Sequence, residues 1–175
     1  TCVVNGWSHA PDYLEVAHPL QRCITDTIDE LCEAPHAHIG VDGCGAPAHV
    51  MSLIGLARSF RNIANGAAGA AGRAVYGAMT GFPVMVGGAA RDVTLLMQSV
   101  PGLMAKDGAD SVYAAALPDG RAVALKVADG GDRARSPLML AALARLGIDV
   151  AVAAPLMEER IMGHGKQVGT VRAVV

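Results

Sequence analysis

The fold of this chain is decided by residues 111–127, which read SVYAAALPDGRAVALKV. Two runs rich in Val, Leu and Ala flank Pro118-Asp119-Gly120, a combination of turn-forming residues that is typical of a hairpin. In the second run, large apolar residues alternate with small or charged ones, as they do in a strand with one buried face. The stretch therefore predicts two antiparallel strands, at residues 111–117 and 121–127.

The residues before this hairpin are mostly patterned as helices. Leu20, Cys23, Ile24 and Ile28 recur at helical spacing behind Pro19, which suits a first helical turn. By the same reasoning, helices are expected at residues 19–32, 48–64, 67–80, 92–99 and 137–146, and strands at residues 103–106, 111–117, 121–127 and 169–174.

Helices that come first and an antiparallel sheet that comes second predict an α+β fold. The expected organisation is a helical lobe at residues 1–99, which contains a glycine-rich loop, and a sheet lobe with a covering helix at residues 100–175. The join near residue 100 is expected to be a boundary between two lobes of one domain and not a flexible tether.

Composition excludes several classes of protein. The 175 residues are enough to bury a core, and with 52% hydrophobic but only 3% aromatic residues that core must be filled by Ala, Gly, Val and Leu. A net charge of −2 without a basic block argues against nucleic-acid binding. No apolar run has the length of a membrane span and no signal peptide opens the chain, so no membrane association is expected.

Four cysteines without a Cys-x-x-Cys pair argue against a secreted disulfide scaffold and favour the reducing cytoplasm. Cys23 and Cys32 follow a helical pattern and are expected to be core thiols.

The densest group of unusual residues is GVDGCGAP at residues 40–47. Glycines let the backbone turn sharply and let a ligand approach it closely. Asp42 has the chemistry of a base or an orienting group, and Cys44 that of a metal ligand or a nucleophile. The alternative is a tight structural loop in which Asp42 caps its own backbone.

A second candidate is Lys106-Asp107-Gly108, at the end of the predicted strand 103–106. An amine at this position can hold a substrate carboxylate or assist proton transfer. The alternative is an ordinary hairpin turn at Asp107-Gly108 with a solvated lysine.

A third candidate is metal binding by His36, His38, Cys44 and His49. Their spacing matches no standard zinc signature, which favours surface histidines over a metal site.

The order of motifs resembles the bacterial L-asparaginase II family, the Rhizobium-type asparaginases. The resemblance covers nearly the whole chain, and the cysteine-containing loop is its most specific part. The matching segments are HPLQ at 18–21, GVDGCGAP at 40–47, GLARSF at 55–60, AKDGA at 105–109, ALKVADG at 124–130 and GKQVG at 165–169.

The resemblance implies a fold related to serine β-lactamases and hydrolysis of the side-chain amide of L-asparagine to L-aspartate and ammonia. It implies a serine nucleophile activated by lysine, with Lys106 and the Cys44 loop completing the site. It also implies that no cofactor is required, although zinc on a Cys-Lys-Cys set, with Cys44 as the second cysteine, occurs in part of the family. The implied roles are catalysis for Lys106 and Asp42, substrate binding for Gly43, Gly45 and Gly108, and metal binding for Cys44.

The chain departs from this family in three respects. It contains no Ser-x-x-Lys segment, it lacks the first cysteine and the lysine of the metal set, and Asp107 follows Lys106 where a glycine is commoner in the family. The resemblance places the nucleophile segment of the family before residue 1, so it implies that the two lobes form one partial domain, the C-terminal half, of a longer enzyme. Its expected partners are L-asparagine and either a second copy of the chain or an N-terminal half. The alternative is a catalytically inactive fragment or a binding domain that keeps the fold.

Overall fold

The computed structural model describes residues 1–174, in which helices and three small antiparallel sheets give the predicted α+β class. The chain forms two compact units, one of residues Thr1–Ser59 and one that starts at Phe60. The division between residues 99 and 100 stays a prediction. No helix among residues 1–174 is both long and apolar enough to cross a membrane.

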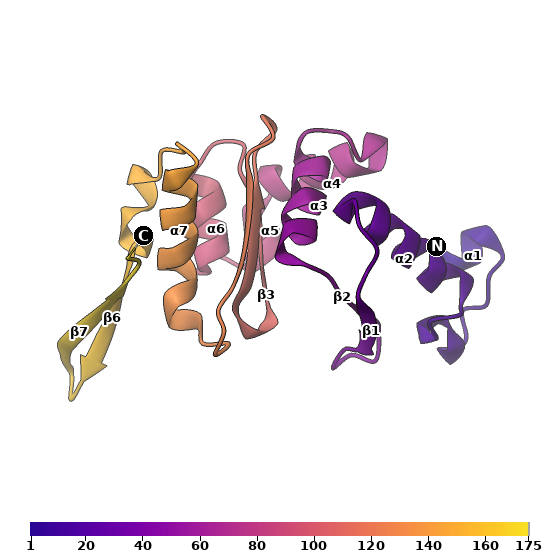
Figure 1. Ribbon diagram of the computed structural model, residues 1–175, viewed down its shortest axis with the longest axis horizontal. Coiled ribbons are helices and arrows are strands. Elements are labelled where there is room, and N and C mark those ends of the chain that lie inside the picture. The colour runs from indigo at the N-terminus through magenta and orange to yellow at the C-terminus, as the bar shows by residue number, and fades with distance from the viewer. Residues whose placement is uncertain (175) are drawn as a thin grey trace. The chain divides into compact units, whose positions relative to one another are not determined.

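The first unit is built around helix α2 and a β-hairpin (Figure 1). Its elements are α1 (Cys2–Asn5), η1 (Pro11–Leu14), α2 (Pro19–Cys32), β1 (His38–Val41), β2 (Pro47–Val50) and the first part of α3 (Leu53–Ala64). Helix α2 begins where predicted, because Pro19 occupies its first turn and His18 Nδ1 accepts a hydrogen bond from the Leu20 amide at 3.1 Å. It ends at Cys32, since Glu33 takes the left-handed conformation with φ 54°.

The helix predicted at residues 48–64 is wrong at its start. Residues Pro47–Val50 pair antiparallel with His38–Val41, and the Ala37 amide donates to the Val50 carbonyl at 2.7 Å. The helix begins only at Leu53, where Ser52 Oγ accepts a hydrogen bond from the Gly55 amide at 3.0 Å and so caps the helix. Apolar spacing continued through residues 48–52, but backbone pairing with β1 determines their conformation.

Of the two cysteines predicted to lie in the core, only Cys32 is buried, and Cys23 is exposed on α2. Both cysteines follow the helical period of apolar residues in α2, but the side of the helix that carries Cys23 faces solvent.

The second unit is centred on a three-stranded antiparallel sheet in the order β3-β4-β5. Its elements are the end of α3, α4 (Gly69–Gly81), α5 (Pro83–Gly87), α6 (Asp92–Ser99), β3 (Met104–Gly108), η2 (Ala109–Ser111), β4 (Val112–Ala116), β5 (Ala122–Lys126), η3 (Asp132–Ala134), α7 (Arg135–Arg145), η4 (Ala151–Leu156), β6 (Glu158–Gly163) and β7 (Lys166–Arg172). The predicted hairpin at Pro118-Asp119-Gly120 is confirmed, since the Leu117 amide donates to the Arg121 carbonyl at 2.9 Å.

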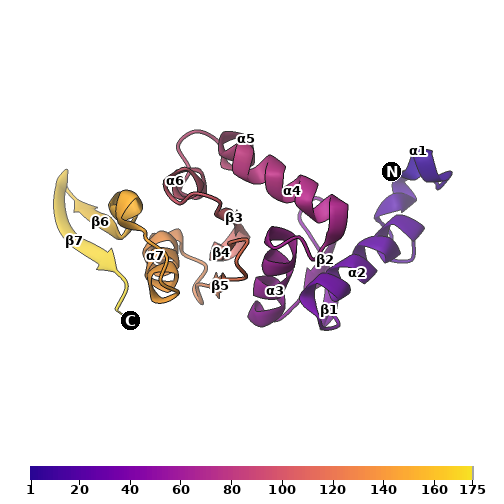
Figure 2. The same ribbon diagram turned by 90° about the horizontal axis from the view of Figure 1, so that it is seen from above.

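Both faces of this sheet are covered. Helices α6 and α7 lie on one side of it in both views (Figure 1, Figure 2), and they share a buried core with alternate residues of β3 and β4. On the other face, Met104 and Ala116 pack against Phe60, Ile63 and Tyr76. Two-sided burial explains why β4 is apolar throughout (Val-Tyr-Ala-Ala-Ala) and does not alternate with polar residues.

A separate β6–β7 hairpin follows α7 and contacts it. The strand predicted at 169–174 corresponds to β7, which begins earlier, at Lys166. Its partner β6 was missed, because Glu158-Glu159-Arg160 is polar and exposed and carries no apolar alternation.

Candidate active site

Strand β3 carries Lys106, Asp107 and Gly108, so the prediction of a turn at Asp107-Gly108 is wrong. Asp107 pairs with Tyr113 and Gly108 with Val112, and the chain reverses only over Ala109–Ser111. Strand alternation leaves Lys106 and Gly108 exposed on one face and buries Asp107 on the other, toward α6 and α7. The motif is therefore part of the sheet and not a solvated turn.

The Asp107 carboxylate is buried, with 4% of its side chain exposed, and three cations converge on it. Lys106 Nζ lies 2.9 Å from Oδ1 and also donates to the Asp107 carbonyl. Arg91 Nη2, from the residue before α6, donates to Oδ2. Arg135 Nη1, from the first turn of α7, lies 3.6 Å from the same oxygen. A buried carboxylate needs such partners, because an unpaired one would be costly.

Arg135 joins this carboxylate to two others. Its Nη2 and Nε donate to the two oxygens of Asp92 at 2.9 and 3.2 Å, a bidentate arrangement. Its Nη1 donates to Asp132 Oδ1 at 3.0 Å, and this oxygen also accepts from Ser111 Oγ at 2.6 Å. One buried guanidinium thus connects α6, β3 and η3.

The electrostatic result is an ionised Asp107. Burial raises its pKa, but hydrogen bonds from Lys106 and Arg91 lower it by more, so the pKa of Asp107 lies below its ordinary value. The hydrogen bond to Asp107 in turn raises the pKa of Arg91.

Tyr113 lies beneath this network, fully buried. The Arg135 guanidinium carbon is 5.7 Å from the centroid of its ring, within the range of a cation–π contact. Its hydroxyl has no hydrogen-bond partner within the described part of the chain, and burial raises its pKa well above the ordinary value. Tyr113 is therefore a neutral packing surface for Arg135 at neutral pH.

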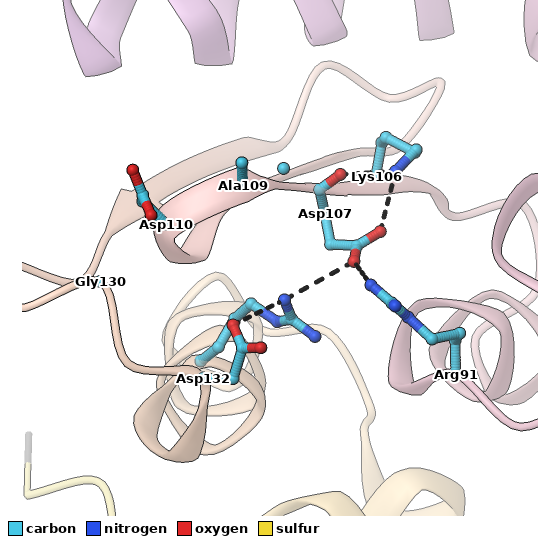
Figure 3. Close-up of a pocket in the computed structure, with 9 residues that line it drawn as sticks. Arg91, Lys106, Asp107, Ala109, Asp110, Gly130 and Asp132 are labelled. Atoms are coloured by element: carbon cyan, nitrogen blue, oxygen red, sulfur yellow. Dashed lines mark hydrogen bonds and ion pairs between the residues drawn. The ribbon is translucent and has the colours of Figure 1, made fainter. Parts of the chain in front are cut away.

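These side chains line a cavity of about 480 Å³ on the second unit (Figure 3). Its lining residues are Arg91, Lys106, Asp107, Gly108, Ala109, Asp110, Gly130, Asp132 and Arg135. The structure therefore places two of the predicted site residues, Lys106 and Gly108, in one polar cavity.

The glycine-rich loop forms the end of the β1–β2 hairpin in the first unit. The Gly45 amide donates to the Asp42 carbonyl at 2.8 Å, and the Asp42 amide donates to the Ala46 carbonyl at 2.9 Å. Gly45 has φ 84°, a conformation that favours glycine, as a type I turn followed by a bulge requires.

Within this loop Asp42 Oδ1 accepts a hydrogen bond from the Gly43 amide at 2.8 Å, and Oδ2 lies 3.6 Å from Cys44 Sγ. Asp42 thus caps its own backbone, as the structural alternative proposed. Asp42, Gly43, Cys44 and Gly45 are all exposed, and their catalytic, substrate-binding and metal-binding roles stay predictions.

Two of the three histidines considered as metal ligands, His36 and His49, have other partners. His36 Nδ1 lies 3.0 Å from the Asp29 carboxylate, and His49 Nε2 lies 2.8 Å from Thr25 Oγ1. Across residues 1–174, no three His, Cys, Asp or Glu side chains are grouped so that they could hold a metal ion.

Comparison with known protein families assigns the chain. The family model described as L-asparaginase II matches residues 1–173. The chain belongs to the L-asparaginase II family. No curated protein matches the chain. Membership in the L-asparaginase II family confirms the resemblance drawn from the motifs and indicates an asparaginase-type hydrolase.

Two residues around Lys106-Asp107-Gly108 were missed in the sequence, namely Arg91 and Arg135, and Asp107 was read there only as part of a turn. A signal for Arg135 existed, because it precedes the buried Met139 and Leu143 at helical spacing and so lies on the buried stripe of α7. The signal for Asp107 depended on recognising that the strand continues to Gly108, so that Asp107 alternates with Lys106.

Proposed function

We propose that this chain contributes to hydrolysis of L-asparagine to L-aspartate and ammonia, with Lys106 as a catalytic residue. The observation that carries the proposal is the position of Lys106: in a member of the L-asparaginase II family, it lies on a strand and lines a polar cavity.

Lys106 is suited to act as a hydrogen-bond donor to the reacting amide. An ammonium has three donors, and two of them are accounted for by Asp107 Oδ1 and the Asp107 carbonyl. Nearly half of the side chain (47%) is exposed, so the third N–H can reach a ligand. Directed at the amide oxygen, it stabilises the negative charge that develops there as the carbonyl is attacked.

The covalent step proposed is acyl transfer through serine. The serine oxygen bonds to the amide carbon and its proton passes to the leaving nitrogen, so that the C–N bond breaks and ammonia leaves; water then hydrolyses the ester to L-aspartate. Residues 1–175 contain no Ser-x-x-Lys. The proposal therefore takes the serine and its activating lysine from a segment outside these residues.

The proposed steps need no zinc. Cys44 is proposed as one ligand of a zinc ion whose other ligands come from the same outside segment as the serine, because within residues 1–174 no three His, Cys, Asp or Glu side chains are grouped. Asp42 is proposed as a base or orienting group, and the main chain at Gly43, Gly45 and Gly108 as substrate contacts.

The test is ammonia release from L-asparagine by the 175-residue chain, alone and with zinc, and by the chain supplied with the N-terminal part of a family enzyme. We expect release that is lost on Lys106→Ala and kept in Lys166→Ala, an exposed lysine at the start of β7 in the separate β6–β7 hairpin. Release that is unchanged in Lys106→Ala would remove this residue from the mechanism. Binding of L-asparagine without ammonia release under any condition would favour a non-catalytic binding domain.

A further inference from the structure

The cavity on the second unit has two ends of opposite charge. Figure 3 shows Lys106 and Arg91 toward one end and Asp110 and Asp132 toward the other. This separation of charge within one cavity constrains the chemistry of its ligand, because each end attracts a group of the other sign.

The cationic end retains donors that the protein does not use. Arg91 has 55% of its side chain exposed and bonds to Asp107 through Nη2. A guanidinium carries five N–H donors. Among residues 1–174 the Arg91 side chain makes no hydrogen bond or ion pair other than the one to Asp107, so its remaining donors can bind a carboxylate.

The anionic end likewise retains acceptors. Asp132 uses Oδ1 to accept from Ser111 and Arg135, and Oδ2 has no partner in the described chain. Asp110 is exposed, and its carboxylate makes no hydrogen bond within the described residues. Lys126 Nζ donates to the backbone carbonyls of Asp110 and Val127 and not to the Asp110 carboxylate, which stays free for a ligand.

The two ends lie close together. Arg135 Nη1 is 3.0 Å from Asp132 Oδ1 and 3.6 Å from Asp107 Oδ2, and the latter oxygen accepts from Arg91. The Nη1 atom of Arg135 therefore lies between two carboxylates. One is Asp132 of the anionic end, and the other is Asp107, which binds Arg91 at the cationic end. The short separation between the two charged ends suits a small ligand that carries a positive and a negative charge. A cavity of about 480 Å³ holds such a ligand together with water.

We infer that the cavity binds a free α-amino acid by both of its main-chain charges, the α-carboxylate at Arg91 and the α-ammonium at Asp110 and Asp132. This inference rests on the proposed function only in naming L-asparagine as that amino acid, whose side-chain amide then faces Lys106. An asparagine within a peptide lacks both charges and is not bound.

The inference is tested by calorimetric binding of three probes that lack the reacting side-chain amide to the 175-residue chain at low salt. L-Aspartate carries both main-chain charges, N-acetyl-L-aspartate lacks the ammonium, and the α-methyl ester of L-aspartate lacks the α-carboxylate. We expect each modified probe to bind about fivefold more weakly than L-aspartate, the upper end for an exposed ionic contact.

Two variants assign each charge to its end of the cavity. Asp110→Asn is expected to weaken the binding of L-aspartate about fivefold or more and to leave the binding of N-acetyl-L-aspartate unchanged. Arg91→Gln is expected to weaken the binding of L-aspartate and of N-acetyl-L-aspartate and to leave the binding of the methyl ester unchanged. Asp26→Asn and Arg22→Gln, at exposed positions of α2, are the matched controls and should change nothing.

The inference is overturned if the unmodified chain binds no L-aspartate at millimolar concentration, or binds all three probes equally. It is also overturned if either variant weakens all three probes to the same extent while its thermal unfolding is unchanged. Selective binding without ammonia release would support the inference and reject the proposed hydrolysis. Ammonia release from L-asparagine that is insensitive to Asp110→Asn and Arg91→Gln would support the proposed hydrolysis and reject the inference.

Discussion

Lys106 Nζ lies 2.9 Å from Asp107 Oδ1, so two adjacent residues of β3 form an ion pair although strand alternation directs them to opposite faces of the sheet. Lys106 remains half exposed in the cavity, whereas Asp107 is held from behind by Arg91 and Arg135. The buried carboxylate thus fixes the position of an amine that is itself accessible to a ligand.

Replacing this carboxylate should destabilise the second unit. In Asp107→Asn the cations that converge on the site lose their shared anion, and the buried amide cannot satisfy them. We expect the free energy of unfolding to fall by about 2 kcal/mol, measured by urea denaturation at pH 7. Asp26→Asn, which changes an exposed carboxylate on α2, is the control and should stay within about 0.5 kcal/mol of the unmodified chain. An Asp107 variant as stable as this control would show that the network adds no stability.

The stabilisation by Asp107 should depend on pH with a defined sign. Because its folded-state pKa is lowered, the unfolded chain binds the proton more readily than the folded chain. The contribution is therefore complete above the unfolded value of about 3.9 and is lost as the pH falls through the lowered folded value.

Urea denaturation from pH 7 to pH 2 measures this dependence. The difference in unfolding free energy between the unmodified chain and Asp107→Asn should be constant from pH 7 to about pH 5 and shrink below about pH 4. A difference that stays constant down to pH 2, or grows there, would contradict the assignment.

Arg135 should be the most sensitive cation of the network. It is 9% exposed and bonds Asp92 and Asp132 while facing Asp107, so Arg135→Met leaves three carboxylates without their common partner. We expect a loss of about 3 kcal/mol in unfolding free energy. Arg135→Lys should recover only part of it, because an ammonium cannot bind Asp92 in a bidentate manner.

The control for this experiment is Arg133→Met, at an exposed position of η3. This substitution should lower the free energy of unfolding by less than about 0.5 kcal/mol. Equal losses in the Arg135 and Arg133 variants would mean that the effect comes from the charge of the loop and not from the buried contacts.

Two glycines of the β1–β2 loop should respond differently to the same substitution. Gly45 has φ 84°, so Gly45→Ala forces an L side chain into the left-handed region at a cost of about 1 kcal/mol. A Cβ at Gly43 meets nothing within 4 Å, and Gly43→Ala should be nearly neutral.

Thermal unfolding of the two variants measures this difference. If Gly43→Ala leaves stability intact and abolishes ammonia release, its predicted substrate contact is supported independently of folding. Equal destabilisation by both substitutions would contradict the turn geometry.

Local sequence determined the elements whose residues settle their own conformation. Pro19 and the apolar repeat behind it located α2, and Pro118-Asp119-Gly120 located the hairpin between β4 and β5. These signals act within a few residues, so they could be read without knowing the rest of the fold. The motifs likewise sufficed to indicate the L-asparaginase II family.

Tertiary structure decided the remaining features, because they depend on partners distant in the chain. Pro47–Val50 has helical apolar spacing but becomes a strand through pairing with β1. Asp107 reads as a turn residue beside Gly108, yet Arg91 and Arg135, brought to it by α6 and α7, make a buried carboxylate stable inside a strand. A charge can be buried only where opposite charges meet it, and which charges meet is set by packing and not by local sequence.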